Sequence, residues 1–210
     1  LTAERLDAAR MEEAGRENET LRRMLGMQAR SDLTLLPARV VARSTDWPGE
    51  VLWIEVAGAP QTGLAVVSPE GLVGRVARTS GTRALVETLW HSRVAISVVD
   101  ARSREQGILR WDPARPGEIS INHVPLQADY RAGDAVITSG MGEVFPKGVL
   151  VGYVRGGHED PETQLKRIRV RPAVRRGRAL ELFLLEERPP LGDATKLYPE
   201  ETGTPVGIPP

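Results

Sequence analysis

Ser139 and the three histidines are the residues through which this sequence could carry out hydrolysis. A serine hydrolase needs a serine nucleophile, a histidine base, a carboxylate that orients the base, and N–H groups that stabilise the oxyanion. Ser139 lies in a glycine-containing turn, whereas His91, His123 and His158 fall at a strand end, between strands and in a turn-like Gly-Gly-His-Glu-Asp segment. No spacing predicts a serine–histidine dyad, so we expect surface or turn-capping histidines and a Ser139 that bonds local backbone. A trypsin-like double-barrel hydrolase is the alternative function.

The sequence offers no good set of metal ligands or reactive thiols. His158, Glu159 and Asp160 are adjacent, and three successive side chains cannot readily converge on one ion, so a solvated turn is the better interpretation. The absence of cysteine excludes disulfides, thiolate metal sites and a cysteine nucleophile. We therefore expect no catalytic residues, no metal and no cofactor.

A basic stretch raises the question of nucleic-acid binding. The chain has 28 basic and 28 acidic residues, so no global field drives it toward nucleic acid or an anionic membrane. Aromatic residues make up only 4 % of the chain, and base-stacking platforms need several of them. A small-barrel nucleic-acid-binding protein is therefore a weaker alternative, and a solvated face or a protein contact at Arg167 and Arg169 fits as well. The stretch consists of Lys166, Arg167, Arg169, Arg171, Arg175, Arg176 and Arg178.

The elements that would position these side chains are short strands. From Pro37 to about Arg188, apolar runs alternate with Gly, Pro, Asp and Ser, which predicts about a dozen strands in a sandwich or barrel. Residues 63–76 and 133–154 share an order of strand, turn, glycine, and strand with an internal glycine. These internal glycines, Gly74 and Gly152, would mark barrel corners or close backbone approaches.

We therefore expect a mainly β fold of two small, related barrels of the six-stranded type. The first is expected at residues 37–100 and the second at residues 101–188, and strand exchange or insertion between the barrels is left open. Residues 189–210 are rich in proline and lack an apolar period, so we expect a disordered tail.

Residues 1–30 predict a helix, because residues 1–29 contain no proline and are rich in good helix formers. A heptad places five residues on one narrow seam, and an asparagine at an a position specifies two strands, so a parallel coiled-coil dimer is favoured. The alternative is a single amphipathic helix that packs on its own domain. The seam consists of Met11, Ala14, Asn18, Leu21 and Leu25.

Tryptophans are the other candidates for contacts with partners. Trp47 precedes Pro48-Gly49 and Trp111 precedes Asp112-Pro113, so both lie near turn signals. Each could anchor a protein interface or cover the open end of a barrel. Trp53 lies in the middle of an apolar run and is expected to fill a barrel.

Three stretches carry a resemblance to a known family. They are a coiled-coil end at residues 17–25, a Gly-Leu-Val-Gly-x-Val element at residues 71–76, and Thr-Ser-Gly, Phe-Pro-x-Gly and Val-Gly-x-Val elements within residues 138–154. Their order and spacing resemble the MreC family of rod shape-determining proteins from about residue 15 to residue 186. A membrane helix and any motif after Arg188 are missing from the match. The signature positions are Gly71, Gly74, Thr138, Ser139, Gly140, Phe145, Pro146, Gly148 and Gly152.

The resemblance implies a non-enzymatic scaffold of cell-wall elongation, a homodimer or larger self-assembly. Its implied partners are the cytoskeletal MreB, the membrane protein MreD, RodA and a class B penicillin-binding transpeptidase. The implied location is the periplasmic side of the bacterial inner membrane, with a single-pass anchor. No run in the given residues approaches the roughly 20 apolar residues of a membrane helix, so we expect this part to be soluble.

Overall fold

The computed structural model describes residues 33–187, except residues 47, 143, 161–164 and 178–180. The predicted helix at residues 1–30, its five seam residues, Trp47 and the predicted tail at 189–210 therefore lie outside the described residues. The described part contains no helix with the length and apolarity of a membrane span.

The described residues form twelve strands, which confirms the mainly β prediction. Several strands alternate buried and exposed side chains as a barrel wall requires: in β11, Ile168 and Val170 are buried and Arg169 is exposed. The strands are β1 (Leu33–Ser44), β2 (Gly49–Val56), β3 (Ala65–Ser68), β4 (Gly71–Ser80), β5 (Arg83–His91), β6 (Ala95–Asp100), β7 (Gln106–Trp111), β8 (Ile119–Val124), β9 (Ala135–Thr138), β10 (Leu150–Asp160), β11 (Leu165–Pro172) and β12 (Glu181–Glu187).

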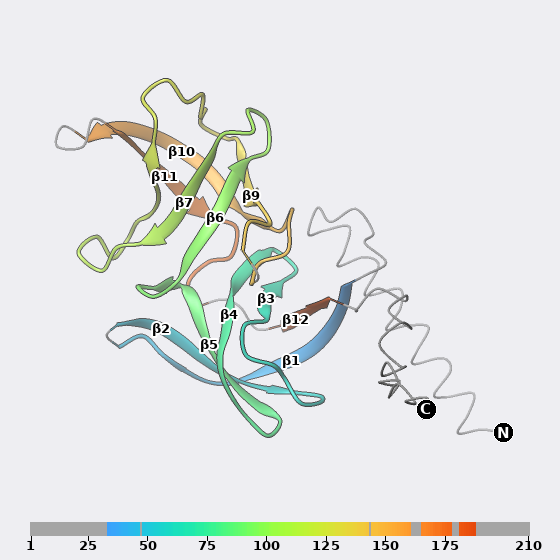
Figure 1. Cartoon of the computed structure of the whole chain (residues 1–210). Helices are drawn as coiled ribbons and strands as arrows, with labels where there is room; N and C mark the ends of the chain where they lie inside the picture. Colours follow the sequence, from blue (N-terminus) through green and yellow to red (C-terminus); the bar gives the residue numbers. More distant parts are fainter. Residues whose placement is uncertain (1–32, 47, 143, 161–164, 178–180, 188–210) are drawn as a thin grey trace, which may run out of the picture.

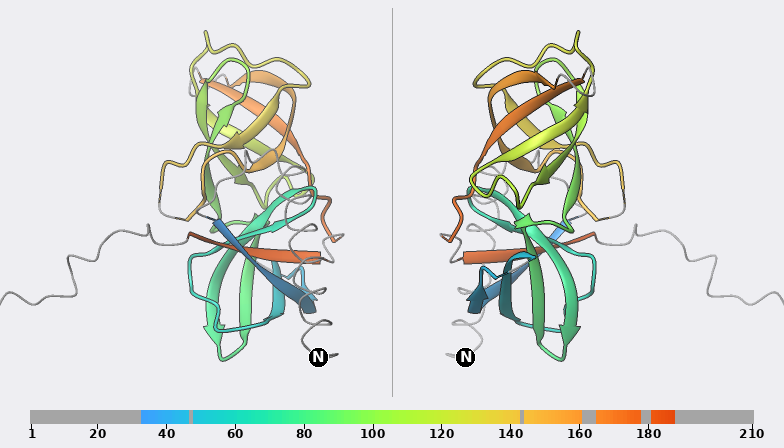
Figure 2. Two further views of the ribbon diagram at one scale, coloured as in Figure 1. Left: turned by 90° about the vertical axis from the view of Figure 1, so that its right-hand side faces the viewer. Right: turned by 90° about the vertical axis from the view of Figure 1, so that its left-hand side faces the viewer.

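The twelve strands form two closed, antiparallel, six-stranded barrels. The first barrel has the order β1-β12-β3-β4-β5-β2, and the second has the order β10-β11-β8-β7-β6-β9. In Figure 1 the second barrel stands above the first, and Figure 2 shows the same stacking from two sides. Closure pairs the edge strands of each sheet with one another, so no strand edge is left open.

The two barrels are built from two six-strand repeats that exchange their last strands. The strand order is the same in both barrels when β1 to β5 are matched to β7 to β11. At the remaining position the first barrel holds β12, paired with β1 and β3, and the second holds β6, paired with β7 and β9. The similarity of residues 63–76 to residues 133–154 is explained, because those segments form β3-β4 and β9-β10.

This topology corrects the expected domain boundaries. The division between residues 100 and 101 is wrong, because β6 (Ala95–Asp100) belongs to the second barrel and β12 (Glu181–Glu187) to the first. The first barrel also begins earlier than Pro37, at Leu33. Of the arrangements left open, strand exchange is present, and it also places the second barrel between β5 and β12 in chain order.

One hydrophobic core runs through both barrels. Its largest cluster of buried side chains includes Leu72 and Leu185 from the first barrel and Ile96 and Leu109 from the second. A second cluster, with Leu52, Ile54 and Leu184, fills the rest of the first barrel. Each such leucine or isoleucine contributes about 2 kcal/mol by burial, so the shared cluster joins the barrels as well as filling them.

Gly74 and Gly152 occupy equivalent places on β4 and β10. A Cβ atom at Gly74 would collide with the backbone oxygen of Glu87 and lie 2.7 Å from the Cα atom of Thr88. A Cβ atom at Gly152 would collide with the backbone oxygen of Arg171 and lie 2.9 Å from the Cα atom of Pro172. The close backbone approach expected of both glycines is confirmed.

Gly152→Ala tests this packing. The added methyl group must push β10 away from β11, and we expect a loss of about 3 kcal/mol in unfolding free energy. For a chain of this size that loss lowers Tm by roughly 10 °C. Gly117→Ala is the control, because a Cβ atom there meets no atom within 4 Å. Equal Tm values for Gly152→Ala and Gly117→Ala, measured by calorimetry, would show that the approach is not tight.

Candidate interaction surfaces

The Ser139 turn is tied to its neighbours by hydrogen bonds to Ser97 and to local backbone. The Ser139 hydroxyl donates to the Ser97 hydroxyl at 2.8 Å and accepts the N–H of Met141 at 3.0 Å. Thr138 is fully buried, and its hydroxyl accepts the N–H of Val149 at 2.9 Å and donates to the carbonyl of Pro146. The expected local backbone bond of Ser139 is confirmed, and this signature turn is a structural element.

His91 is buried at the point where the chain crosses between barrels. Only 2 % of its surface is exposed, and its Nδ1 atom accepts the N–H of Arg93 at 3.2 Å, so of the two expected roles, surface or turn-capping, His91 has the turn-capping one. Burial lowers the pKa of His91, and the carboxylate of Glu87 opposes this shift. A neutral His91 therefore shapes the three-residue crossing from β5 to β6.

The other two histidines lie in strands. His158 is exposed as expected, but it lies in β10 opposite Arg167 and not in a turn. His123 lies in β8, and its side chain is outside the described part. Within the described residues, no group of three or more His, Cys, Asp or Glu side chains is placed to hold a metal ion.

Trp111 is buried and Trp53 is exposed. Trp111 is only 7 % exposed, and its Nε1 atom donates to the carbonyl of Pro116 at 3.1 Å, so of the two roles expected for it the exposed anchor is wrong. Trp53 was expected to fill a barrel but is 42 % exposed. The physical reason is register: in β2 the buried positions are Leu52, Ile54 and Val56, so Trp53 points to the other face.

Trp53 and Val41 are exposed apolar residues on paired strands of the first barrel, and we call them the Trp53–Val41 patch. Val41 is 49 % exposed and sits in a bulge of β1, next to Ala42, which pairs with Trp53. The Arg39–Glu55 ion pair, at 2.9 Å, lies on the same two strands, and Arg39 lowers the pKa of Glu55. An exposed tryptophan with a charged rim is the kind of surface that anchors protein interfaces.

Arg167 and Arg169 lie on β11, with Arg169 exposed and Arg167 half-buried. The backbone of β11 pairs them with His158 and Gly156 of β10. Two residues further along, the Arg171 guanidinium lies 5.5 Å from the ring centre of Tyr153, an aromatic partner that the sequence pattern did not reveal. Arg171 therefore covers the ring of Tyr153, the one tyrosine of β10 on which a nucleic-acid base could stack.

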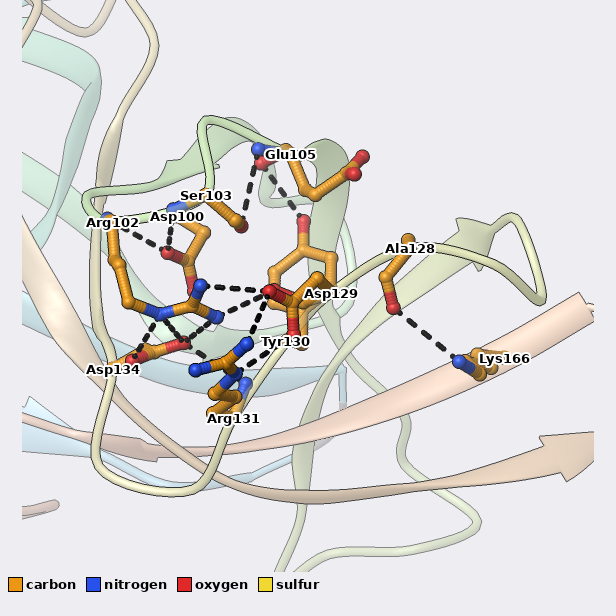
Figure 3. A network of polar contacts seen from close by, with 10 residues as sticks. All are labelled: Asp100, Arg102, Ser103, Glu105, Ala128, Asp129, Tyr130, Arg131, Asp134 and Lys166. Carbon is orange, nitrogen blue, oxygen red and sulfur yellow. Dashed lines mark hydrogen bonds and ion pairs between the residues drawn. The ribbon is translucent and has the colours of Figure 1, made fainter.

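A network of ion pairs closes the far end of the second barrel, and Figure 3 shows it from close by. Arg102 donates to the carboxylates of Asp129 and Asp134, each at 2.8 Å, and Arg131 donates to Asp129 at 3.0 Å. Arg102 lowers the pKa of Asp134 to about 2. The network joins the β6–β7 and β8–β9 loops, and sequence spacing alone gave no sign of it.

Closed barrels that share a core and exchange strands define a class, the double-β-barrel proteins. A family model described as "Rod shape-determining protein MreC, barrel core" matches residues 40–186. The chain belongs to the MreC family.

Known relatives and structures agree with this assignment. The cell shape-determining protein MreC of Cereibacter sphaeroides is 34 % identical over 148 residues, which are 69 % of this chain and 46 % of that protein. The Escherichia coli protein of the same name is 28 % identical over 172 residues, 80 % of this chain and 46 % of its own length. The chain thus spans about half the length of the curated relatives it matches.

Solved structures show the same fold. MreC of Listeria monocytogenes superposes with a TM-score of 0.67 at 23 % identity and covers 89 % of this chain and 93 % of its own. MreC of Helicobacter pylori, solved in a complex with the penicillin-binding protein PBP2, has a TM-score of 0.61 at 21 % identity and covers 75 % of this chain and 99 % of its own.

The Arg102 network predicts an acid-sensitive contribution to stability. The pKa of Asp134 is about 2 in the folded state and 3.8 without the pairing, so the unfolded chain binds more protons between these values. This contribution is complete above about pH 5 and is lost as pH falls toward about 2. Removing the cation with Arg102→Met should therefore reduce the fall in urea midpoint between about pH 6 and about pH 3.

Arg110→Met is the matched control, because Arg110 is exposed on β7 and makes no ion pair within the described residues. It should keep the wild-type response to pH. An unchanged pH response in Arg102→Met would contradict the role given to the Asp134 carboxylate.

Proposed function

We propose that this protein is a non-enzymatic scaffold of the cell-wall elongation machinery. The observation that carries the proposal is the match of residues 40–186 to the MreC barrel core. The H. pylori relative binds the penicillin-binding protein PBP2, which supports a transpeptidase as a partner of this chain too. Two rigid barrels on a shared core give a surface that can hold another protein without changing shape.

The proposal includes that the protein has no catalytic activity. A hydrolase needs a histidine within hydrogen-bond reach of its serine, whereas Ser139 bonds to Ser97 and to backbone. His91 is buried and caps a turn. Among the described side chains, the observed bonds therefore favour binding over catalysis.

The wider assembly follows from family membership. We infer that the protein links the cytoskeletal MreB and the membrane protein MreD to RodA and a class B penicillin-binding transpeptidase, which together maintain rod shape. A related structure is described as the major periplasmic domain of a cell shape-determining filament, which supports a periplasmic location and self-assembly. Membrane anchoring through a single N-terminal helix completes the proposed arrangement.

Two surfaces are proposed for partner contacts. One is the basic face of β11 with Arg167 and Arg169, and the other is the Trp53–Val41 patch on the first barrel. The proposal is tested by measuring, with biolayer interferometry, whether the purified chain binds the transpeptidase of the same organism. Absence of binding at micromolar concentration would contradict it.

Ser139→Ala tests the absence of chemistry. We expect the variant, placed in the complete protein, to restore rod shape in a cell that lacks the gene, because a scaffold does not use the hydroxyl. His158→Ala, at an exposed position of β10, should behave in the same way. Loss of rod shape in Ser139→Ala, with normal folding and normal binding to the transpeptidase, would revive the hydrolase alternative.

Leu21→Glu tests the proposed parallel coiled coil of Met11, Ala14, Asn18, Leu21 and Leu25. A charge on the apolar seam must be desolvated in the dimer, so we expect the dimer constant to weaken by about tenfold or more. Sedimentation equilibrium over a range of concentrations measures this change. Glu19→Lys, off the proposed seam, is the control, and a wild-type chain that stays monomeric at high concentration would rule out the dimer.

A further inference from the structure

A groove opens at the junction of the two barrels, where the chain crosses from β11 back to β12. Its volume is about 390 Å³, within the range of ligand sites. Trp90 from β5 and Pro172 from β11 are the partly exposed apolar residues of its lining, which also includes the buried Val170 and Val174. The groove is therefore formed by both barrels together, and it exists only when the strand exchange is complete.

Arg176 separates this groove from a neighbouring hollow. Its guanidinium carbon lies 5.7 Å from the ring centre of Trp90 and 5.6 Å from that of Trp111. A second hollow, of about 530 Å³, shares Arg176 with the first and is lined by Asp46, Trp111 and Pro116. Two indole rings hold the guanidinium in place, so little side-chain entropy remains to be lost when it binds a ligand.

The groove carries an excess of positive charge. Arg155, Arg169, Arg171, Arg175 and Arg176 line it, and Glu118 is the single acidic residue in the lining. None of these five arginines forms an ion pair within the described residues, and the Nε atom of Arg176 and the Oε1 atom of Glu118 are both buried without a hydrogen-bond partner there.

Arginines elsewhere on the barrels are partly paired. Arg39, Arg43, Arg75 and Arg102 each pair with a carboxylate at 3.1 Å or less, whereas the exposed Arg110 has no ion pair within the described residues. The chain as a whole has no net charge, so the excess in the groove is local. Like charges held close together raise the free energy of the empty groove, and an anionic ligand relieves that repulsion.

We propose that this junction groove binds an acidic peptide segment of a partner protein. Two or more carboxylates would accept forked hydrogen bonds from the arginines, and an apolar side chain would pack against Trp90 and Pro172. The apolar walls favour a peptide over a lipid phosphate, because a headgroup would leave them uncovered. The proposal deepens the scaffold function and rests on it, since it names the chemistry of one partner contact.

The test uses a fluorescein-labelled eight-residue peptide, Gly-Glu-Leu-Glu-Glu-Leu-Glu-Gly, and its glutamine counterpart, with the purified chain. Fluorescence anisotropy should show saturable binding of the glutamate peptide alone, weakened by higher salt. Arg176→Gln and Arg155→Glu should each weaken it by about tenfold or more, the scale expected for losing a charge-assisted hydrogen bond. Arg155 is exposed, so Arg155→Glu keeps the test valid if Arg176→Gln disturbs the tryptophans.

Arg78→Glu is the matched control, because Arg78 is exposed on β4 and does not line the groove; it should bind as the wild type does. Absence of saturable binding, or equal binding by wild type and Arg155→Glu, would overturn the proposal. Phosphatidylglycerol vesicles that bind through Arg155 and Arg176, with no binding of the peptide, would also overturn it in favour of a lipid phosphate.

Measuring how the transpeptidase binds wild type and the groove variants distinguishes a failure of the groove proposal from a failure of the scaffold function. If the transpeptidase binds wild type and both groove variants equally and the peptide does not bind, the groove proposal fails and the scaffold function stands. If the peptide binds through the groove but the transpeptidase does not bind the chain, the groove proposal is supported and the transpeptidase contact fails.

Discussion

Closure of each barrel by a strand from the other repeat is the constraint on which this structure depends. A five-stranded remnant of either barrel would expose two rows of unpaired N–H and C=O groups, which is unfavourable in water and worse against a core. In the first barrel β12 satisfies β1 and β3, and in the second barrel β6 satisfies β7 and β9. The barrels are therefore a single cooperative unit, in which loss of the exchange would open both.

The exchange forces the chain to cross the junction twice. His91 lies at the first crossing and Arg176 at the second. The first crossing is the short turn between β5 and β6, which the buried, neutral His91 shapes. The second crossing, after β11, carries Arg176 between Trp90 and Trp111. A backbone crossing prevents regular packing of side chains, so it leaves space for a groove. In this way the strand exchange that holds the barrels together also brings Arg155, Arg169, Arg171, Arg175 and Arg176 to one groove.

The closed barrels are stabilised in more than one place. Stability near the junction comes from a shared apolar cluster, and the far end of the second barrel is closed by the Arg102 network. Ser139, which superficially resembles a nucleophile, is instead a link between a loop and β6 through Ser97. Such a framework presents fixed surfaces on two barrels, and the proposed stalk would multiply them by self-assembly.

The sequence by itself determined the β class, the repeat, the tight glycines and the family, because period-2 patterns and residues such as Gly74 and Gly152 act through local backbone sterics. Predictions from the sequence were wrong where they depended on contacts between segments far apart in the chain. The boundary at residue 100 was wrong because strand order depends on which partner completes each barrel, and Trp53 is exposed because register fixes the face of a side chain. Only the tertiary structure could bring Trp90, Trp111 and Arg176 together, since contacts across a strand exchange leave no periodic signal in the chain.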